Sequence, residues 1–264
     1  MKKEKDPGGQ KFLRGLVRLA DSAVNLAVLS VFLLLMAYGI YALWDARQVY
    51  AGADPSGYTI YKPEEDGESF DELRAMNPEV FGWLTVYGTP IDYPLVQGKD
   101  NSKYVNTDAK GDYSLSGSIF LDSRNQKDFS DPVSILYGHD MAEEKMFGCL
   151  ADFGEKDYFQ SHRYGKIYHD GRWYGVEFFA FLKADAYDDS VYAPGTEAEK
   201  LPGFAESLYR KAENWRQIQV TGEDHLVLLS TCTDASTNGR HILAGKITEQ
   251  VEPDPFAQKG KERK

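Results

Sequence analysis

Residues 23–44 form a run of 22 residues without a charged side chain, and no other feature constrains this chain as strongly. A helix of this length reaches about 33 Å, enough to cross a hydrocarbon core of about 30 Å. The run is apolar on every side, whereas a helix at a protein surface keeps a polar face. Aromatic residues gather at its far end, as they do at membrane interfaces: Tyr38, Tyr41 and Trp44. The sequence therefore predicts one transmembrane helix.

The charges on either side of this run predict its orientation. Residues 1–22 are rich in lysine and arginine, whereas acidic residues predominate in residues 45–67. The positive-inside rule then puts the N-terminal segment in the cytoplasm and everything after the helix outside the cell. A cleaved signal peptide is the alternative, but its apolar region normally has about 7–15 residues. We expect residues 45–67 to be an extracellular tether, because glycines and prolines interrupt any regular pattern there.

From residue 68 onward the pattern is one of many short strands. Apolar runs bounded by turn residues lie at 80–86, 91–96, 118–121, 133–137, 173–182, 218–220, 226–230 and 241–248. Helical spacing is found at 69–76, where Ser69 begins a capping-box pattern, and at 141–153 and 196–215. Because strands and helices do not alternate regularly, we expect a mainly β domain over residues 68–250, a closed barrel or sandwich with few helices. The polar tail, residues 251–264, is predicted to be disordered.

One of the two cysteines closes an apolar strand at a place suited to chemistry. Cys232 follows Leu-Leu-Ser-Thr at residues 228–231, and Arg240 comes eight residues later. Upstream, the apolar run 133–137 leads in a similar way to His139. Strand ends on a rigid scaffold often carry catalytic residues, and a cysteine is activated by a neighbouring histidine. The pattern indicates a thiol nucleophile, a histidine that carries protons and a cationic helper.

Taken together, these segments resemble the sortase family, most closely its class B branch. The family's cysteine strand reads Thr-Leu-Ser-Thr-Cys with an arginine on the next strand, and residues 228–232 here read Leu-Leu-Ser-Thr-Cys. Further segments resemble the family in the same order: Gly82-Trp83, Ile91-Asp92-Tyr93-Pro94, Gly117-Ser118-Ile119-Phe120-Leu121-Asp122 and Tyr137-Gly138-His139-Asp140-Met141. The helical stretch 196–215 resembles the insertion that distinguishes class B. The resemblance covers residues 69–248 and implies a sortase-like closed β-barrel with an N-terminal helix and this inserted helix.

The resemblance implies a membrane-anchored cysteine transpeptidase on the outer face of a Gram-positive cell. Such enzymes cut the C-terminal sorting signal of a secreted protein after its threonine, and join that threonine to a cell-wall amine in a peptidoglycan cross-bridge or lipid II. A pilin lysine is the alternative acceptor, while a plain surface cysteine protease and a non-catalytic adhesin are alternatives of other classes. Acyl transfer through cysteine needs no cofactor and no metal. The net charge of −11 argues against nucleic acid as a partner, because phosphate binding needs clustered lysine and arginine.

Each of the three residues has an expected role. Cys232 attacks the threonine carbonyl, because a thiolate is an efficient nucleophile at neutral pH. His139 protonates the departing amine and then deprotonates the incoming one. Arg240 donates hydrogen bonds to the oxyanion and positions the threonine backbone. Ser230 lies two residues before the cysteine on the same strand face, which makes it a candidate contact for the sorting peptide.

Other polar residues have weaker functional interpretations. Asp234 matches an acidic position of class B sortases and is a candidate for orienting the histidine, but a loop carboxylate also suits a turn. Cys149 lies on an apolar helical face and is expected to be structural. The other histidines, His162, His169, His225 and His241, share no ligand spacing, so surface or strand roles are expected. The acidic run of Asp122, Asp128 and Asp131 lacks the spacing of an EF-hand, so no metal site is predicted.

Overall fold

The computed structural model describes residues 7–63, 68–232 and 238–257, and the chain divides into two units, up to Gln48 and from Val49. The first unit is one long helix, α1 (Pro7–Gly52), whose last turn belongs to the second unit. Its segment Phe12–Gly52 is long and apolar enough to cross a membrane. The apolar side chains of this segment are exposed, as lipid-facing side chains are. The helix predicted over residues 23–44 is confirmed, and it extends further at both ends.

The segment after α1 is more regular than the sequence suggested. Two short 3₁₀ helices follow it, η1 (Pro55–Gly57) and η2 (Thr59–Tyr61). Tyr58 and Tyr61 are buried, and the Ala53 carbonyl accepts a hydrogen bond of 2.8 Å from the Tyr93 hydroxyl. Burial of these aromatic rings therefore orders a segment whose glycines and prolines predicted an irregular chain. The helix α2 (Glu68–Met76) comes next, and Ser69 lies inside it rather than at its N-cap.

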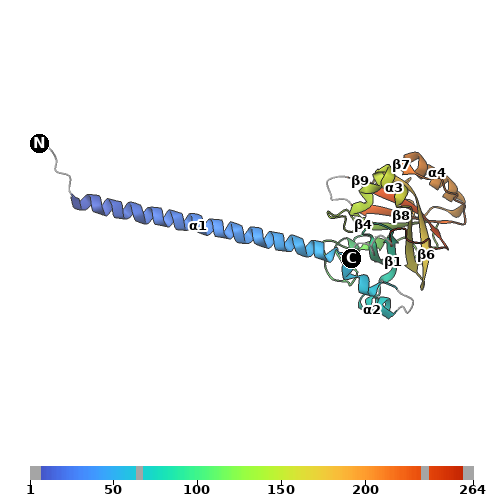
Figure 1. Cartoon of the computed structure of the whole chain (residues 1–264), viewed down its shortest axis with the longest axis horizontal. Coiled ribbons are helices and arrows are strands. Elements are labelled where there is room, and N and C mark those ends of the chain that lie inside the picture. The colour runs from blue at the N-terminus through green and yellow to red at the C-terminus, as the bar shows by residue number, and fades with distance from the viewer. Residues whose placement is uncertain (1–6, 64–67, 233–237, 258–264) are drawn as a thin grey trace. The chain divides into compact units, whose positions relative to one another are not determined.

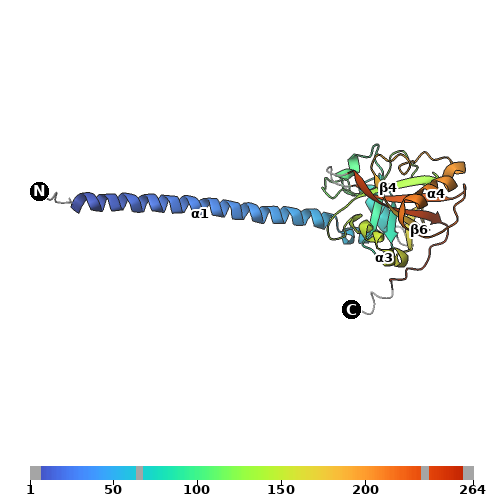
Figure 2. The same cartoon turned by 90° about the horizontal axis from the view of Figure 1, so that it is seen from above.

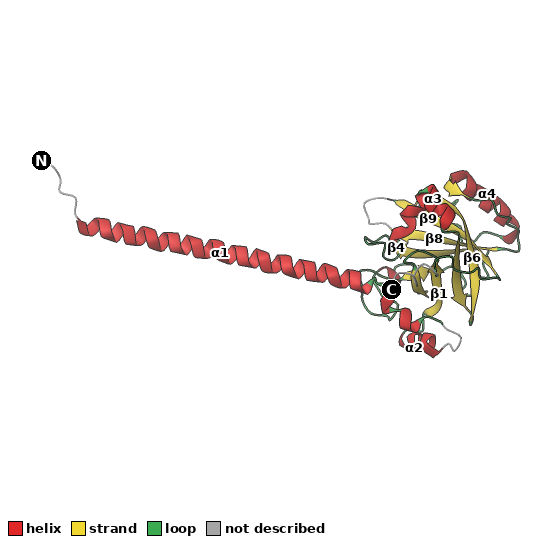
Figure 3. Cartoon of the chain, viewed as in Figure 1, coloured by secondary structure: helices red, strands yellow, loops and turns green. Residues whose placement is uncertain are grey.

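Eight strands of the second unit close into a barrel (Figure 3). Their order around the barrel is β5-β1-β2-β3-β4-β8-β9-β6, and pairing of β5 with β6 closes it. The strands are β1 (Val80–Val86), β2 (Asp92–Val96), β3 (Ile119–Leu121), β4 (Val133–His139), β5 (Tyr164–His169), β6 (Arg172–Asp185), β8 (His225–Cys232) and β9 (Gly239–Thr248). A ninth strand, β7 (Ala212–Trp215), pairs with β6 outside the ring. The predicted closed β-barrel is confirmed.

Two hydrophobic clusters lie on opposite faces of the strands that carry the candidate residues. Because side chains alternate along a strand, β8 contributes Val227 and Leu229 to one cluster and Leu226 and Leu228 to the other. The first cluster takes side chains from all eight strands of the ring and therefore fills the barrel. The second joins β4, β6, β8 and β9 to the inserted helix α4 (Leu201–Lys211). In Figures 1 and 2, α4 lies over one side of the barrel. Figure 1 shows α2 well apart from α4.

Three predicted elements are wrong in whole or in part. Residues 141–153 do not form one helix, because Glu143, Glu144 and Met146 have positive φ. These three residues are followed by the 3₁₀ helix η4 (Gly148–Gly154) and then by a short α-helix, α3 (Lys156–Ser161). The helix predicted over 196–215 consists of η5 (Ala198–Lys200) and α4, because residues 212–215 pair with β6 as β7. Residues 218–220 form no strand.

The beginning of the C-terminal tail packs on the domain. The ring of Phe256 stacks on His162 with centroids 4.8 Å apart, and His162 stacks on Tyr158 at 3.8 Å. These contacts differ from the disorder predicted for the tail, because the ring of Phe256 packs on the domain. Residues 258–264 lie outside the described part of the chain.

Candidate active site

Strand register brings three separate segments to one edge of the barrel. The strands β4 and β8 run parallel, and their register pairs Tyr137 with Ser230 and His139 with Cys232. On the other side of β8, the antiparallel strand β9 pairs Ile242 with Ser230. The pairing of β8 with β9 ends there, and Arg240 lies two residues before Ile242, at the start of β9. The structure describes the backbone of Cys232 but not its side chain, and Asp234 lies outside the described residues.

The imidazole of His139 is held in one orientation by the backbone. Its Nε2 lies 2.8 Å from the carbonyl oxygen of Val105, in the short 3₁₀ helix η3 (Lys103–Val105). A carbonyl oxygen can only accept a hydrogen bond, so Nε2 carries a hydrogen. This contact leaves Nδ1 as the ring nitrogen that can meet a substrate. The side chain is half-buried, which leaves it open to a substrate.

Arg240 lines a cavity of about 390 Å³, which we call the Arg240 hollow. Its guanidinium donates a hydrogen bond of 3.1 Å from Nη1 to the carbonyl of Gly239. The volume lies within the usual range for ligand sites, about 300–1,000 Å³. The hollow is lined by Asn101, Phe120, Arg124, Tyr137, Ala186, Tyr187, Asp189, Tyr192 and Arg240.

A buried carboxylate holds one wall of this hollow together. Asp122 is fully buried and accepts hydrogen bonds from Nε and Nη2 of Arg124 at 2.8 and 2.7 Å. It also accepts bonds from the Tyr137 hydroxyl at 3.0 Å and from the Asn101 amide at 3.1 Å. Burial acts to raise the pKa of Asp122, but the bonds from Arg124 and Tyr137 outweigh it and hold the pKa below its usual value. The carboxylate therefore stays ionised, and its oxygens serve this network.

Ser230 supports another lining residue of the hollow, Tyr192. Its Oγ lies 2.9 Å from the hydroxyl of Tyr192 and is itself nearly inaccessible to solvent. The ring of Tyr192 stacks on that of Tyr137, with centroids 6.4 Å apart and planes 17° apart. Sequence reasoning missed both tyrosines, and also Arg124. Tyr137 could have been identified from the sequence, because it lies two residues before His139 and therefore shares its strand face.

The remaining cysteine and histidines have structural surroundings, although His241 follows Arg240 on β9 at this edge, where its backbone N–H donates a hydrogen bond of 3.1 Å to the Thr231 hydroxyl. Cys149 is fully buried, which raises the pKa of its thiol to about 12 and agrees with a structural role. His162 and His169 are buried against aromatic rings, and His225 has Nδ1 3.0 Å from the Asp131 carbonyl. His241 Nδ1 is buried without a hydrogen-bond partner among the described residues. In that same part of the chain, no three His, Cys, Asp or Glu side chains cluster as metal ligands would.

Solved structures define the class of protein. A Streptococcus pyogenes class B sortase involved in pilus biogenesis aligns with a TM-score of 0.62 and 40% identity, covering 69% of this chain and 99% of that one. The fold and this likeness define a sortase, a cysteine transpeptidase built on a closed β-barrel. No protein-family model matches the chain. Sortase B of Listeria monocytogenes is 32% identical over 208 residues, which cover 77% of this chain and 82% of the relative. This chain belongs to the sortase B family, which excludes the non-catalytic adhesin considered from the sequence.

Two further solved structures contain ligands. A Staphylococcus aureus sortase B–substrate complex is 26% identical with a TM-score of 0.64, and the match covers 78% of this chain and 94% of that one. A sortase B complexed with triglycine is 27% identical with a TM-score of 0.63, and covers 74% of this chain and 90% of that one.

Proposed function

We propose that this sortase cleaves a C-terminal sorting signal after its threonine and transfers the threonine acyl group to a cell-wall amine. The observation that carries the proposal is the strand register, which pairs His139 with Cys232 and leads on to Arg240. The relatives solved with a substrate and with triglycine support a peptide donor and a glycine amine as acceptor. The Arg240 hollow beside this edge has room for part of a peptide.

The first half-reaction makes a thioester. The thiolate of Cys232 forms a bond to the threonine carbonyl carbon, and Arg240 donates hydrogen bonds to the resulting oxyanion. The carbon–nitrogen bond then breaks, and the departing nitrogen takes a proton from Nδ1 of the His139 imidazolium. The products are the acyl-enzyme, a free amine and neutral His139.

The second half-reaction restores the enzyme. The acceptor amine attacks the thioester carbon, the carbon–sulfur bond breaks, and Cys232 leaves as a thiolate. Nδ1 of His139 takes the proton that the attacking amine loses, so the imidazolium is regenerated. Water competes with the amine at this step, so transfer requires the acceptor to be held close to the thioester.

Two neighbouring residues have supporting roles in this proposal. The Ser230 hydroxyl bonds to Tyr192, so we assign it the positioning of that ring, through which it affects the bound peptide. Asp234 remains a candidate for orienting His139, on the strength of its position two residues after Cys232.

A pilin lysine is the second candidate acceptor. The observation that favours it is the 40% identity to a class B sortase involved in pilus biogenesis. Both acceptors are primary amines and would use the same chemistry at Cys232. They differ in the surface that must approach the thioester, so only an acceptor assay separates them.

We also propose that the helix Phe12–Gly52 anchors the protein with its N-terminus in the cytoplasm and the barrel outside. Its support is the basic character of residues 1–22 together with the apolar helix that follows. Protease added to intact protoplasts should then digest the barrel. Protection of the barrel until the cells are lysed would indicate the opposite orientation.

A peptide library tests the reaction itself. The full-length protein in detergent is incubated with peptides in which threonine is fixed and the three preceding positions are randomised, with and without triglycine. Mass spectrometry should detect threonine joined to triglycine, and Cys232→Ala should give no product. Release of the free threonine carboxylate alone, unchanged by triglycine, would instead indicate a plain cysteine protease. Replacing triglycine with a lysine-containing pilin peptide tests the second acceptor.

A further inference from the structure

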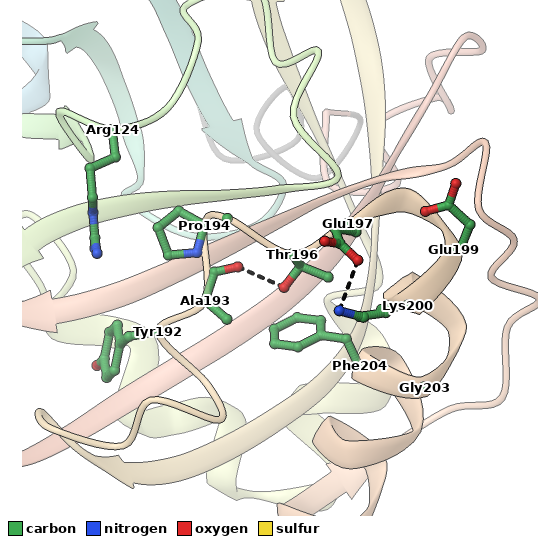
Figure 4. A pocket seen from close by; sticks show the side chains of 11 residues that line it. Arg124, Tyr192, Ala193, Pro194, Thr196, Glu197, Glu199, Lys200, Gly203 and Phe204 are labelled. Atoms are coloured by element: carbon green, nitrogen blue, oxygen red, sulfur yellow. Dashed lines mark hydrogen bonds and ion pairs between the residues drawn. The ribbon is translucent and has the colours of Figure 1, made fainter.

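A second and larger hollow adjoins the Arg240 hollow. This α4 hollow has a volume of about 720 Å³ and is lined by residues 192–197, 199–200 and 203–204 together with Arg124. Arg124 and Tyr192 line both hollows, so the two hollows adjoin at these residues, and the α4 hollow lies on the side toward α4. Figure 4 shows Arg124 and Tyr192 on one side of the α4 hollow, and Glu197 with Lys200 on the other.

The walls of the α4 hollow are already built without a ligand. The Thr196 hydroxyl donates a hydrogen bond of 2.7 Å to the Ala193 carbonyl, and Lys200 pairs with Glu197 at 2.8 Å (Figure 4). Beneath the hollow, Leu201 and Leu208 of α4 are fully buried against the barrel. A bound peptide would therefore meet a preformed surface, which lowers the entropy cost of binding.

The lining favours an apolar side chain over a charged one. Phe204 and Pro194 give the hollow an apolar base, and Phe204 is only 9% exposed. Both cations around it are paired, Lys200 with Glu197 and Arg124 with Asp122, and Glu199 also lines the hollow. The side chain of Arg124 is nevertheless 60% exposed, so it can still donate to a peptide carbonyl.

We propose that the α4 hollow binds the residues of the donor protein that precede the sorting motif, with an apolar side chain against Phe204. The inference rests on the proposed function, in which the threonine carbonyl reacts beside Arg240. The chain before the threonine stays bonded to Cys232 through both half-reactions, whereas the chain after it must leave and be replaced by the acceptor. A hollow that adjoins the Arg240 hollow therefore suits the part that precedes the threonine.

Gly203 offers a way to fill the hollow without disturbing the fold. A Cβ built at Gly203 meets no atom within 4 Å, and the backbone there is not in the left-handed region. Gly203→Phe should therefore place a ring at the wall of the hollow, while Gly203→Ala adds a single methyl group. Gly57 has equally open surroundings but lines neither hollow, so Gly57→Phe is the matched control for a new exposed ring.

The assay compares peptides that share the motif selected from the library. One carries the motif alone, one adds Ser-Ser-Leu-Ser before it, one adds four serines before it, and one adds Ser-Ser-Leu-Ser after the cleaved bond. For the wild type, the preceding leucine extension should raise kcat/KM about tenfold over the serine extension, mainly through KM. Gly203→Phe should remove this gain and leave turnover of the bare motif unchanged, while Gly203→Ala and Gly57→Phe should keep the gain.

The outcomes separate this inference from the proposed function. If the wild type turns over no library peptide, the proposed function fails and this inference fails with it. If the wild type turns over the bare motif but gains nothing from the leucine extension, only the inference is overturned. It is also overturned if the gain survives Gly203→Phe, or if it comes from the extension after the cleaved bond.

Discussion

The two ends of the β4–β8–β9 strands carry similar residue types but differ in what those residues can do. At one end lie His139, Cys232 and Arg240 beside the Arg240 hollow. At the other end is a hollow of about 520 Å³, which we call the far hollow. It is lined by Asp128, Phe129, Ser130, His169, Tyr174, Glu223, Asp224, His225, Lys246, Ile247, Thr248 and Glu249.

The polar groups of the far hollow are occupied by structural contacts. His169 is 4% exposed and stacks on Tyr174 with the ring planes 4° apart. His225 is bonded to the Asp131 carbonyl, and Lys246 forms an ion pair of 2.7 Å with Asp224. His139, in contrast, is half-buried and has one ring nitrogen fixed by Val105, which leaves Nδ1 for proton transfer. Among the described residues, the two ends therefore differ in that the one with the Arg240 hollow has a cysteine in register with a half-buried histidine.

The largest expected effect tests this contrast at the thiol. Cys232→Ala should lower peptide cleavage on the order of 10⁴-fold or more, because the reaction loses its nucleophile. A methanethiosulfonate reagent should label the wild type once, at Cys232, and leave the buried Cys149 unlabelled. Intact-mass spectrometry before and after unfolding in urea distinguishes the two thiols. Activity retained by Cys232→Ala would show that Cys232 is not the nucleophile, and the contrast between the two ends would then fail.

The next effect concerns the cation at the same edge. Arg240→Lys should lower kcat/KM by about 10²–10³-fold, because an ammonium cannot replace the planar fork that donates to the oxyanion. Lys246→Arg, at the far hollow, is the matched exchange and should change kcat/KM little. Near-normal turnover by Arg240→Lys would mean that Arg240 contributes only charge.

The sequence was sufficient for the long apolar helix and for most strands, because these depend on local patterns, whereas the roles of Cys232, His139 and Arg240 stay predictions. Alternation along a strand fixes which face a residue occupies, but not which strand lies beside it. The pairing of His139 with Cys232 is a contact between strands about ninety residues apart, so it needed the family resemblance or the structure. Tyr192 and Arg124 come from connecting segments without a periodic pattern, and nothing local marked them.

The wrong elements have a common physical reason. Residues 212–215 fit helical spacing, yet pairing with β6 draws them into β7. The strand β5 was missed because it is short and contains Gly165 and Lys166, which interrupt its apolar pattern. In each case a tertiary contact overrides a weak local preference.

A smaller effect is expected from the carboxylate behind the Arg240 hollow. Asp122→Asn should lower the free energy of unfolding by about 2 kcal/mol at pH 7, because Arg124 loses its charged partner and Tyr137 an ionised acceptor. The folded pKa of Asp122 lies below the unfolded value of about 3.9, so its contribution is present above that pH and is lost as pH falls through the folded pKa. The difference between wild type and variant should therefore shrink in urea unfolding at pH 3. A constant difference in unfolding free energy at both pH values would show that Asp122 stabilises the fold through its shape and not through its charge.

The smallest effect on activity is expected at the far hollow. His169→Phe keeps an aromatic ring against Tyr174 and should change kcat/KM by less than about twofold, because among the described residues its ring contacts, Tyr174 and Phe129, lie at the far hollow. Burial lowers the pKa of His169 despite the opposing charges of Asp170 and Asp128. Below about pH 6.5 the unfolded chain then binds a proton that the folded chain does not, so the wild type loses stability as pH falls from 7 toward 5. His169→Phe should flatten this dependence in thermal unfolding of the detergent-solubilised protein. A tenfold loss of turnover with an unchanged pH profile would instead connect the far hollow to catalysis.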